Sequence, residues 1–158
     1  MTTAKTCKQC GADLALARLE AMRGEQSGLA LSIEGMPAYA CTKGHRRFLA
    51  ADFPLRLIDS LSKADAPDLP VARKKGLFKK RYLCPGCGGE LPDEAGTHAT
   101  LERTLTLLDS APFSATISVP LYRCGSCGVA AMHPGQDRTD ALMKAASQAF
   151  QSAGIPPG

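Results

Sequence analysis

Four cysteines in two C-x-x-C pairs constrain this 158-residue chain more than any other feature. The pairs are Cys84 with Cys87 and Cys124 with Cys127, and a glycine follows each pair. Two intervening residues let a tight turn aim both sulfurs at one point, and glycine supplies the positive φ that such a turn often needs. Four thiolates at this spacing are typical of a tetrahedral zinc site. The sequence therefore predicts a four-cysteine zinc centre in the second half of the chain.

The first half of the chain repeats this pattern. Cys7 and Cys10 form a C-x-x-C pair that is followed by glycine, and a Pro-x-Tyr-x-Cys motif ends at Cys41, as another does at Cys124. Each residue of the later motif lies 83 positions after its counterpart, which indicates a duplicated unit.

The two copies differ at the fourth ligand. The position that matches Cys127 is Gly44, and His45 follows it. A longer side chain one residue later can still reach the metal, so we predict a second zinc site whose ligands are Cys7, Cys10, Cys41 and His45. The alternative is that His45 is a surface residue and that the first site has lost its metal.

Between its ligand pairs, each copy has the pattern of a β-hairpin. In the second copy, residues 100–107 alternate in part, 109–112 have turn chemistry, and 113–119 alternate strictly between apolar and polar side chains. In the first copy, 29–33 alternate after a turn predicted at 24–28. The Ala-rich segment before that turn also suits a helix, and we predict a hairpin by analogy with the second copy.

A helix is predicted after each hairpin, over 52–62 and over 137–153, from apolar residues at helical spacing. The predicted fold is a small, metal-stabilised α+β protein with two tandem zinc ribbons (β-hairpins that grip a metal), each followed by an α-helix. Its segments are the first ribbon and helix (1–62), a Pro/Ala-rich and then basic linker (63–81), the second ribbon and helix (82–154), and a tail (155–158).

The composition suggests that bound metal, rather than a large hydrophobic core, stabilises the fold. Seven cysteines cannot all pair within one chain, and with 5% aromatic residues and no Trp each half is expected to have a thin core. Residues 1–6 contain no apolar stretch, and no run approaches the ~20 residues of a membrane span. We therefore expect a cytoplasmic location, no membrane contact, and cysteines that bind metal rather than form disulfides.

Positive charge is concentrated in one short segment. Six of the 19 basic residues fall in 73–81, which leaves 13 basic against 15 acidic residues elsewhere. Both predicted zinc–thiolate centres are anionic, so the metal-loaded protein is expected to carry only about +1. The candidate nucleic-acid-binding residues are Arg73, Lys74, Lys75, Lys79, Lys80 and Arg81. The alternative is a solvated basic linker.

The sequence offers no catalytic constellation. It has no phosphate-binding glycine loop and no H-E-x-x-H motif, and both predicted zinc sites are complete with four protein ligands. His98 is expected in a loop and His133 in an exposed turn. We therefore expect a protein that is not an enzyme. An iron site of the rubredoxin type is the redox alternative for the second centre.

The second copy resembles the zinc ribbon of the YgiT type, which forms the N-terminal domain of MqsA-like antitoxins. The resemblance rests on C-P-G-C at 84–87 and on P-L-Y-R-C-G-S-C-G at 120–128. In those antitoxins the zinc is structural and the ribbon serves protein contact. For this chain the resemblance implies only the ribbon fold and a metal held by Cys84, Cys87, Cys124 and Cys127. No helix-turn-helix domain is expected in the about 30 residues after Cys127, so the antitoxin function is not implied.

These observations predict a non-catalytic protein with two structural zinc ions per chain that acts as a protein-interaction or scaffold module. The apolar faces of the predicted helices and the low net charge favour another protein as the partner. Two alternatives remain: binding of DNA or RNA through the basic linker, and electron transfer by a rubredoxin-like iron site.

Overall fold

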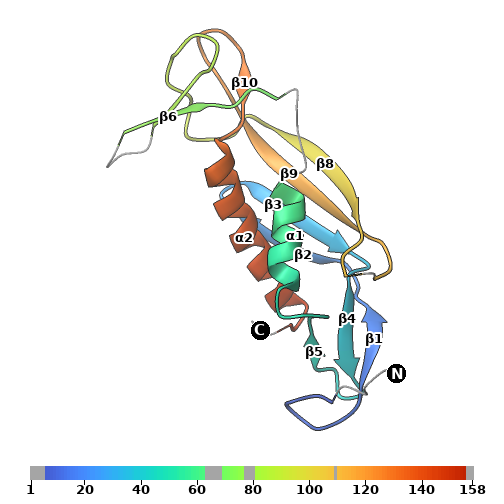
Figure 1. Ribbon diagram of the computed structural model, residues 1–158. Helices are drawn as coiled ribbons and strands as arrows, with labels where there is room; N and C mark the ends of the chain where they lie inside the picture. The colour runs from blue at the N-terminus through green and yellow to red at the C-terminus, as the bar shows by residue number, and fades with distance from the viewer. Residues whose placement is uncertain (1–5, 63–68, 77–80, 109, 156–158) are drawn as a thin grey trace.

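The computed structural model describes residues 6–62, 69–76, 81–108 and 110–155 (Figure 1). Its elements are β1 (Leu14–Arg18), β2 (Met22–Gln26), β3 (Leu29–Glu34), β4 (Pro37–Cys41), β5 (Arg46–Arg47), α1 (Phe53–Ser62), β6 (Arg73–Lys75), β7 (Arg81–Leu83), β8 (Thr97–Leu105), β9 (Phe113–Arg123), β10 (Ala130–Ala131) and α2 (Gly135–Ser152). Both predicted helices and the predicted hairpin of the second copy, β8–β9, are confirmed. Within these ranges, no helix has the length and apolar character needed to cross a membrane.

The largest sheet joins the two halves of the chain. β2, β3 and β9 are neighbours in that order, and β8 and β10 also pair with β9. β3 runs antiparallel to β9 from Ala30↔Ser118 to Glu34↔Ser114, so a strand from the first half of the chain lies beside a strand from the second half. Both strands bury alternate residues, and the register brings the two buried sets to the same face.

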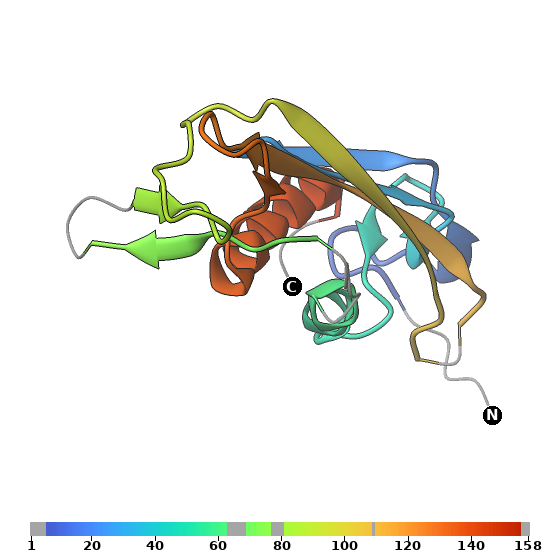
Figure 2. The ribbon, with the colours of Figure 1, turned by 90° about the horizontal axis from the view of Figure 1, so that it is seen from above.

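α1 and α2 lie on that apolar face, beneath the sheet in Figure 2. Ile33 of β3, Ile117 of β9 and Leu57 of α1 belong to one buried cluster with residues of α2. The two halves therefore share the main core, because an apolar sheet face must be buried against a second layer. A smaller, separate cluster that includes Leu91 and Tyr122 lies around Cys84 and Cys124. The proposed boundaries of the two ribbon segments stay a prediction.

The first copy does not form a single hairpin. β1 pairs with β4 and β4 with β5, whereas β2 turns back to pair with β3. The chain bends between β1 and β2, where the Leu19 N–H donates to the Met36 carbonyl at 2.9 Å and the Leu19 carbonyl accepts from the Gly35 N–H at 3.2 Å. The predicted hairpin is thus divided between two sheets. β1 and β4, which ends at Cys41, form a small sheet with β5, whereas β2 and β3 join the large sheet.

Part of the predicted linker is a strand. β6 pairs antiparallel with β7, which leads directly into Cys84, and Val71 bridges to Met132. The backbone groups of β7 need partners, and β6 supplies them along one edge. Residues 63–68 and 77–80 of the predicted linker lie outside the described residues.

Candidate metal centres

The second predicted site is assembled from two turns. Cys84 and Cys87 come from the turn after β7, and Cys124 and Cys127 from the turn after β9. Sγ of Cys84 lies 3.5 Å from Sγ of Cys127, and Sγ of Cys87 lies 3.5 Å from Sγ of Cys124. Sulfurs bound to one tetrahedral zinc at about 2.3 Å would be about 3.8 Å apart. The four thiols are therefore placed to hold one metal ion.

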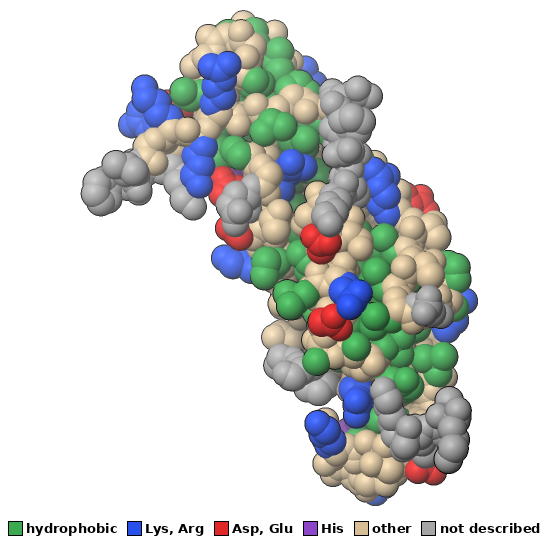
Figure 3. Space-filling model, in the orientation of Figure 1, with side chains coloured by type: hydrophobic (Ala, Val, Ile, Leu, Met, Phe, Trp, Pro, Cys, Tyr) green, Lys and Arg blue, Asp and Glu red, His purple; other side chains and the backbone are tan. Residues whose placement is uncertain are grey.

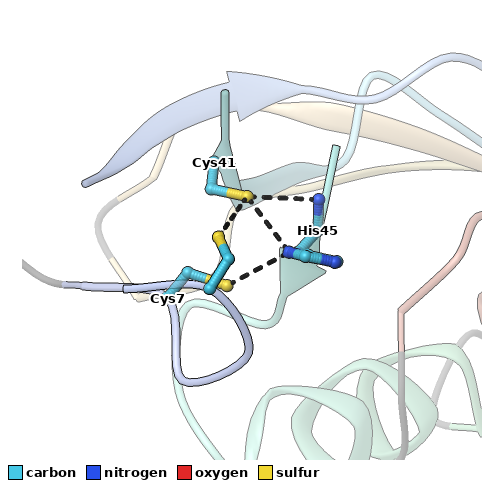
Figure 4. A group of neighbouring side chains, drawn as sticks. Cys7, Cys41 and His45 are labelled. Atoms are coloured by element: carbon cyan, nitrogen blue, oxygen red, sulfur yellow. Dashed lines mark hydrogen bonds between the residues drawn. The ribbon is translucent and has the colours of Figure 1, made fainter. Parts of the chain in front are cut away.

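The first site brings together the three cysteines and the histidine that the sequence predicts. Nδ1 of His45 lies 3.5 Å from Sγ of Cys7 and 3.4 Å from Sγ of Cys41, and Sγ of Cys10 lies 3.7 Å from Sγ of Cys41. Figure 4 shows Nδ1 of His45 turned towards the sulfurs. A tetrahedral zinc would separate its sulfur and nitrogen ligands by about 3.6 Å. The alternative that His45 is merely a surface residue does not fit this geometry.

Three of the four ligand turns share one backbone pattern. The N–H of the first cysteine donates to the carbonyl five residues later, and a glycine N–H donates back to the cysteine carbonyl. The first bonds are Cys7 to Ala12 at 2.8 Å, Cys84 to Gly89 at 2.7 Å and Cys124 to Val129 at 2.8 Å. The glycines have positive φ values of 74°, 78° and 79°, in the same order. This turn directs the sulfurs of residues i and i+3 towards one point.

The turn at Cys41 is one residue shorter, which explains the histidine. The Cys41 N–H donates to the carbonyl of His45 at 2.9 Å, only four residues later. The glycine with positive φ is Gly44, at φ 87°, in the position where the other turns have their second cysteine. The next residue is His45, and its longer side chain covers the added distance to the sulfurs.

Backbone N–H groups favour the thiolate form of the cysteines. The N–H groups of Cys127 and Ser126 lower the pKa of Cys124 to about 6. Burial raises the pKa of Cys41, but the N–H groups of His45 and Lys43 outweigh it and lower that pKa to about 6. The N–H groups of Ala12 and Val129 act in the same direction on Cys10 and Cys127, but burial and the neighbouring thiols outweigh them and raise both pKa values. The backbone therefore favours the metal-binding thiolate form at only part of each cluster.

His133 is half-buried between two tyrosines rather than exposed in a turn. Its half-buried ring is sandwiched between Tyr82 and Tyr122, with centroid distances of 3.9 Å and 4.3 Å and interplanar angles of 12° and 3°. The Tyr82 hydroxyl donates to Oδ2 of Asp137 at 2.8 Å. This stack ties β7, β9 and α2 together. Sequence spacing gives no signal for it, because the three rings come from separate parts of the chain.

Replacing His133 by phenylalanine is expected to keep the stack and to remove a pH dependence. Burial lowers the pKa of His133, against an opposing effect of Asp137. The unfolded state then holds the proton more tightly, so wild-type stability falls as pH drops below about 6.5. The urea midpoint of wild type should therefore fall relative to that of His133→Phe between pH 8 and pH 6, with metal content checked at each pH. The matched control is His98→Phe on β8. A constant difference for His133→Phe would contradict a buried, neutral ring.

The candidate nucleic-acid-binding residues are only partly described. Arg73, Lys74, Lys75 and Arg81 are exposed on β6 and β7. Lys79 and Lys80 lie outside the described residues. His98, expected in a loop, is exposed on β8.

All seven cysteines of the chain fall in the two metal-ligand clusters, and none forms a disulfide. Each cluster presents four ligand atoms within 4.8 Å of one another. Comparison of the chain with known protein families, curated proteins and solved structures gives no match. The function is therefore inferred from the geometry of the centres and from the surfaces that they support.

Proposed function

We propose that the protein is a non-catalytic binding module whose shape depends on two structural zinc ions. Each cluster supplies four protein ligands, and a four-coordinate zinc keeps no open position for water or substrate. The first cluster, with three thiolates and one imidazole, has a ligand set that zinc commonly takes, whereas a rubredoxin-type iron is held by four thiolates. The small sheet of the first centre and the turns of the second lie at opposite ends of the molecule (Figure 1). The two zinc ions would thus stabilise the two ends of the molecule, and the surface between these ends would bind the partner.

An apolar groove between α1 and α2 is the surface that best suits a protein partner. It encloses a cavity of about 250 Å³, and its apolar lining includes Phe48, Leu55, Ile58, Met143, Ala146 and Phe150. Leu55 is 65% exposed and Met143 is 44% exposed, although both are large apolar side chains. Exposed apolar residues grouped around a hollow are typical of protein-interaction sites. The proposed protein-binding function rests on this exposed apolar groove.

The spacing of the lining residues favours a helical partner segment. Leu55 and Ile58 are three residues apart on α1, and Met143 and Ala146 are three apart on α2. Residues at this spacing form a ridge along each helix, and a third helix can set its own apolar ridge between two such ridges. We infer that the groove takes the apolar face of an amphipathic helix from another protein.

The exposed side chain of Leu55 provides the test. A photo-crosslinking residue at position 55, introduced into the protein in its native cells, is expected to capture the partner. Leu55→Gln should then weaken binding of that purified partner about tenfold or more, which is about 1.4 kcal/mol, because it removes apolar contact and places a polar amide in an apolar interface. The affinity is measured by calorimetry.

Leu16 on β1 is the matched control, since it is the same residue with the same 65% exposure. A crosslinker at position 16 should not capture this partner, and Leu16→Gln should bind it as wild type does. Equal capture from both positions, or unchanged affinity in Leu55→Gln, would exclude the groove as the docking site.

A further inference from the structure

The β6–β7 ribbon sorts its basic residues by face. Its register pairs Arg73 with Leu83, Lys74 with Tyr82 and Lys75 with Arg81. Paired residues share a face, and successive residues of a strand alternate between faces. Lys74 and Tyr82 face the body of the protein, where both contact Asp137. In the described part of the ribbon, the other face therefore carries three exposed cations, Arg73, Lys75 and Arg81.

The pairing of Lys75 with Arg81 is electrostatically unfavourable. Residues directly opposite in an antiparallel pair are close neighbours, and two like charges there destabilise the pair. In the described part of the ribbon, the acidic residue that pairs with a strand is Glu90. It forms a β-bridge with Leu83, which is itself paired with Arg73. Among the residues that the structure describes, no acid is in register with the pair of Lys75 and Arg81. An external anion would relieve the repulsion that this pair creates.

The base of the ribbon is held firmly by the rest of the protein. Tyr82 stacks on His133 and donates to Asp137, and Nζ of Lys74 lies 3.3 Å from Oδ1 of Asp137. The ribbon projects from the end of the molecule in Figures 1 and 2, and Figure 3 shows Lys and Arg side chains gathered at that end. The exposed cations are therefore presented on a fixed support, which lowers the entropy cost of binding.

We propose that the β6–β7 ribbon is a DNA-binding arm that lies in the major groove of a duplex and contacts its phosphates through Arg73, Lys75 and Arg81. The major groove of B-form DNA, about 12 Å wide, admits a two-stranded ribbon, whereas the deep, narrow major groove of A-form RNA does not. Contacts to phosphates carry no sequence information, so the arm binds duplexes of different sequence alike. This interaction is independent of the α1–α2 groove.

Fluorescence anisotropy of the full, metal-loaded chain tests the proposal. The probes are a 20-base-pair DNA duplex, an RNA duplex of the same length and polyglutamate, each at 50 mM and 200 mM salt. Three phosphate contacts predict a salt slope of about −2.7, which is about 40-fold weaker DNA binding at the higher salt. The DNA duplex should bind more tightly than either other probe.

The informative variant reverses three charges: Arg73→Glu, Lys75→Glu and Arg81→Glu. It should lose DNA binding while it keeps both metal ions. The matched control, Arg23→Glu with Arg56→Glu and Lys144→Glu, makes the same change of net charge at exposed positions on β2, α1 and α2 and should keep most of the affinity. If the reversed ribbon does not fold, the single variants Lys75→Gln and Arg81→Gln should each lower the magnitude of the salt slope by about 0.9.

Three results would overturn the proposal. The first is a metal-loaded wild type that does not bind duplex DNA at 50 mM salt. The second is an equal loss of affinity in the two triple variants, which would show attraction by net charge alone. The third is RNA duplex or polyglutamate binding as tight as that of DNA, which would assign the arm to another polyanion.

Discussion

Metal content is expected to fall from about two ions per chain to about one when His45 is replaced by alanine. Gly44 occupies the place of the missing cysteine, and the described residues place no other histidine or cysteine in that cluster. Binding of structural zinc contributes about 10–16 kcal/mol in small zinc domains at neutral pH, so the small sheet of β1, β4 and β5 should lose its order with the ion. Elemental analysis and native mass spectrometry measure the loss, and we expect zinc rather than iron.

His98→Ala is the control for this substitution. His98 is exposed on β8 and belongs to neither cluster, so both ions should remain. Two ions retained by His45→Ala would remove His45 from the first centre. A coloured wild-type protein that contains iron at the second centre would instead support the electron-carrier alternative.

A second large effect is expected from one methyl group at Gly24. A Cβ built there would lie 1.8 Å from the carbonyl oxygen of Ala145 and 2.7 Å from its carbonyl carbon. Both are backbone atoms of α2, so no side chain can rotate away, and β2 or α2 must shift as a whole. Overpacking typically costs about 1–3 kcal/mol, and Gly24→Ala should reach or exceed the upper end of that range. The free energy of unfolding in urea measures the cost.

Gly96→Ala is the matched control for Gly24→Ala. A Cβ at Gly96 would meet only Cβ of Arg123, at 3.9 Å, which is an ordinary contact. Its free energy of unfolding should stay within about 0.5 kcal/mol of wild type, as for most surface substitutions. If Gly24→Ala lowered the free energy of unfolding by less than about 1 kcal/mol, β2 and α2 would be packed less closely than in the structure.

Most residues of the two candidate metal clusters were predictable because the geometry of their turns is local. Two residues between cysteines, with glycine next, define a turn that needs no distant contact, and three of the four turns are built in this way. The strand alternation of residues 113–119 and the helical spacing in 137–153 are likewise properties of short segments. His45 was predicted by comparison of the copies, and its physical reason, a turn one residue shorter, became visible only in the structure.

The sequence by itself thus determined which residues meet in the two clusters that could hold a metal ion, and which segments become the two helices and the β8–β9 hairpin. Only the tertiary structure decided that β3 pairs with β9, that Arg73–Lys75 form a strand, that His133 lies between two tyrosines and that Gly24, predicted in a turn, lies in β2 against α2. Each of these contacts joins parts of the chain that are distant in sequence or depends on which strand edge is left unpaired. No local pattern encodes that choice, because the burial that favours it is shared between elements and arises only when they pack together.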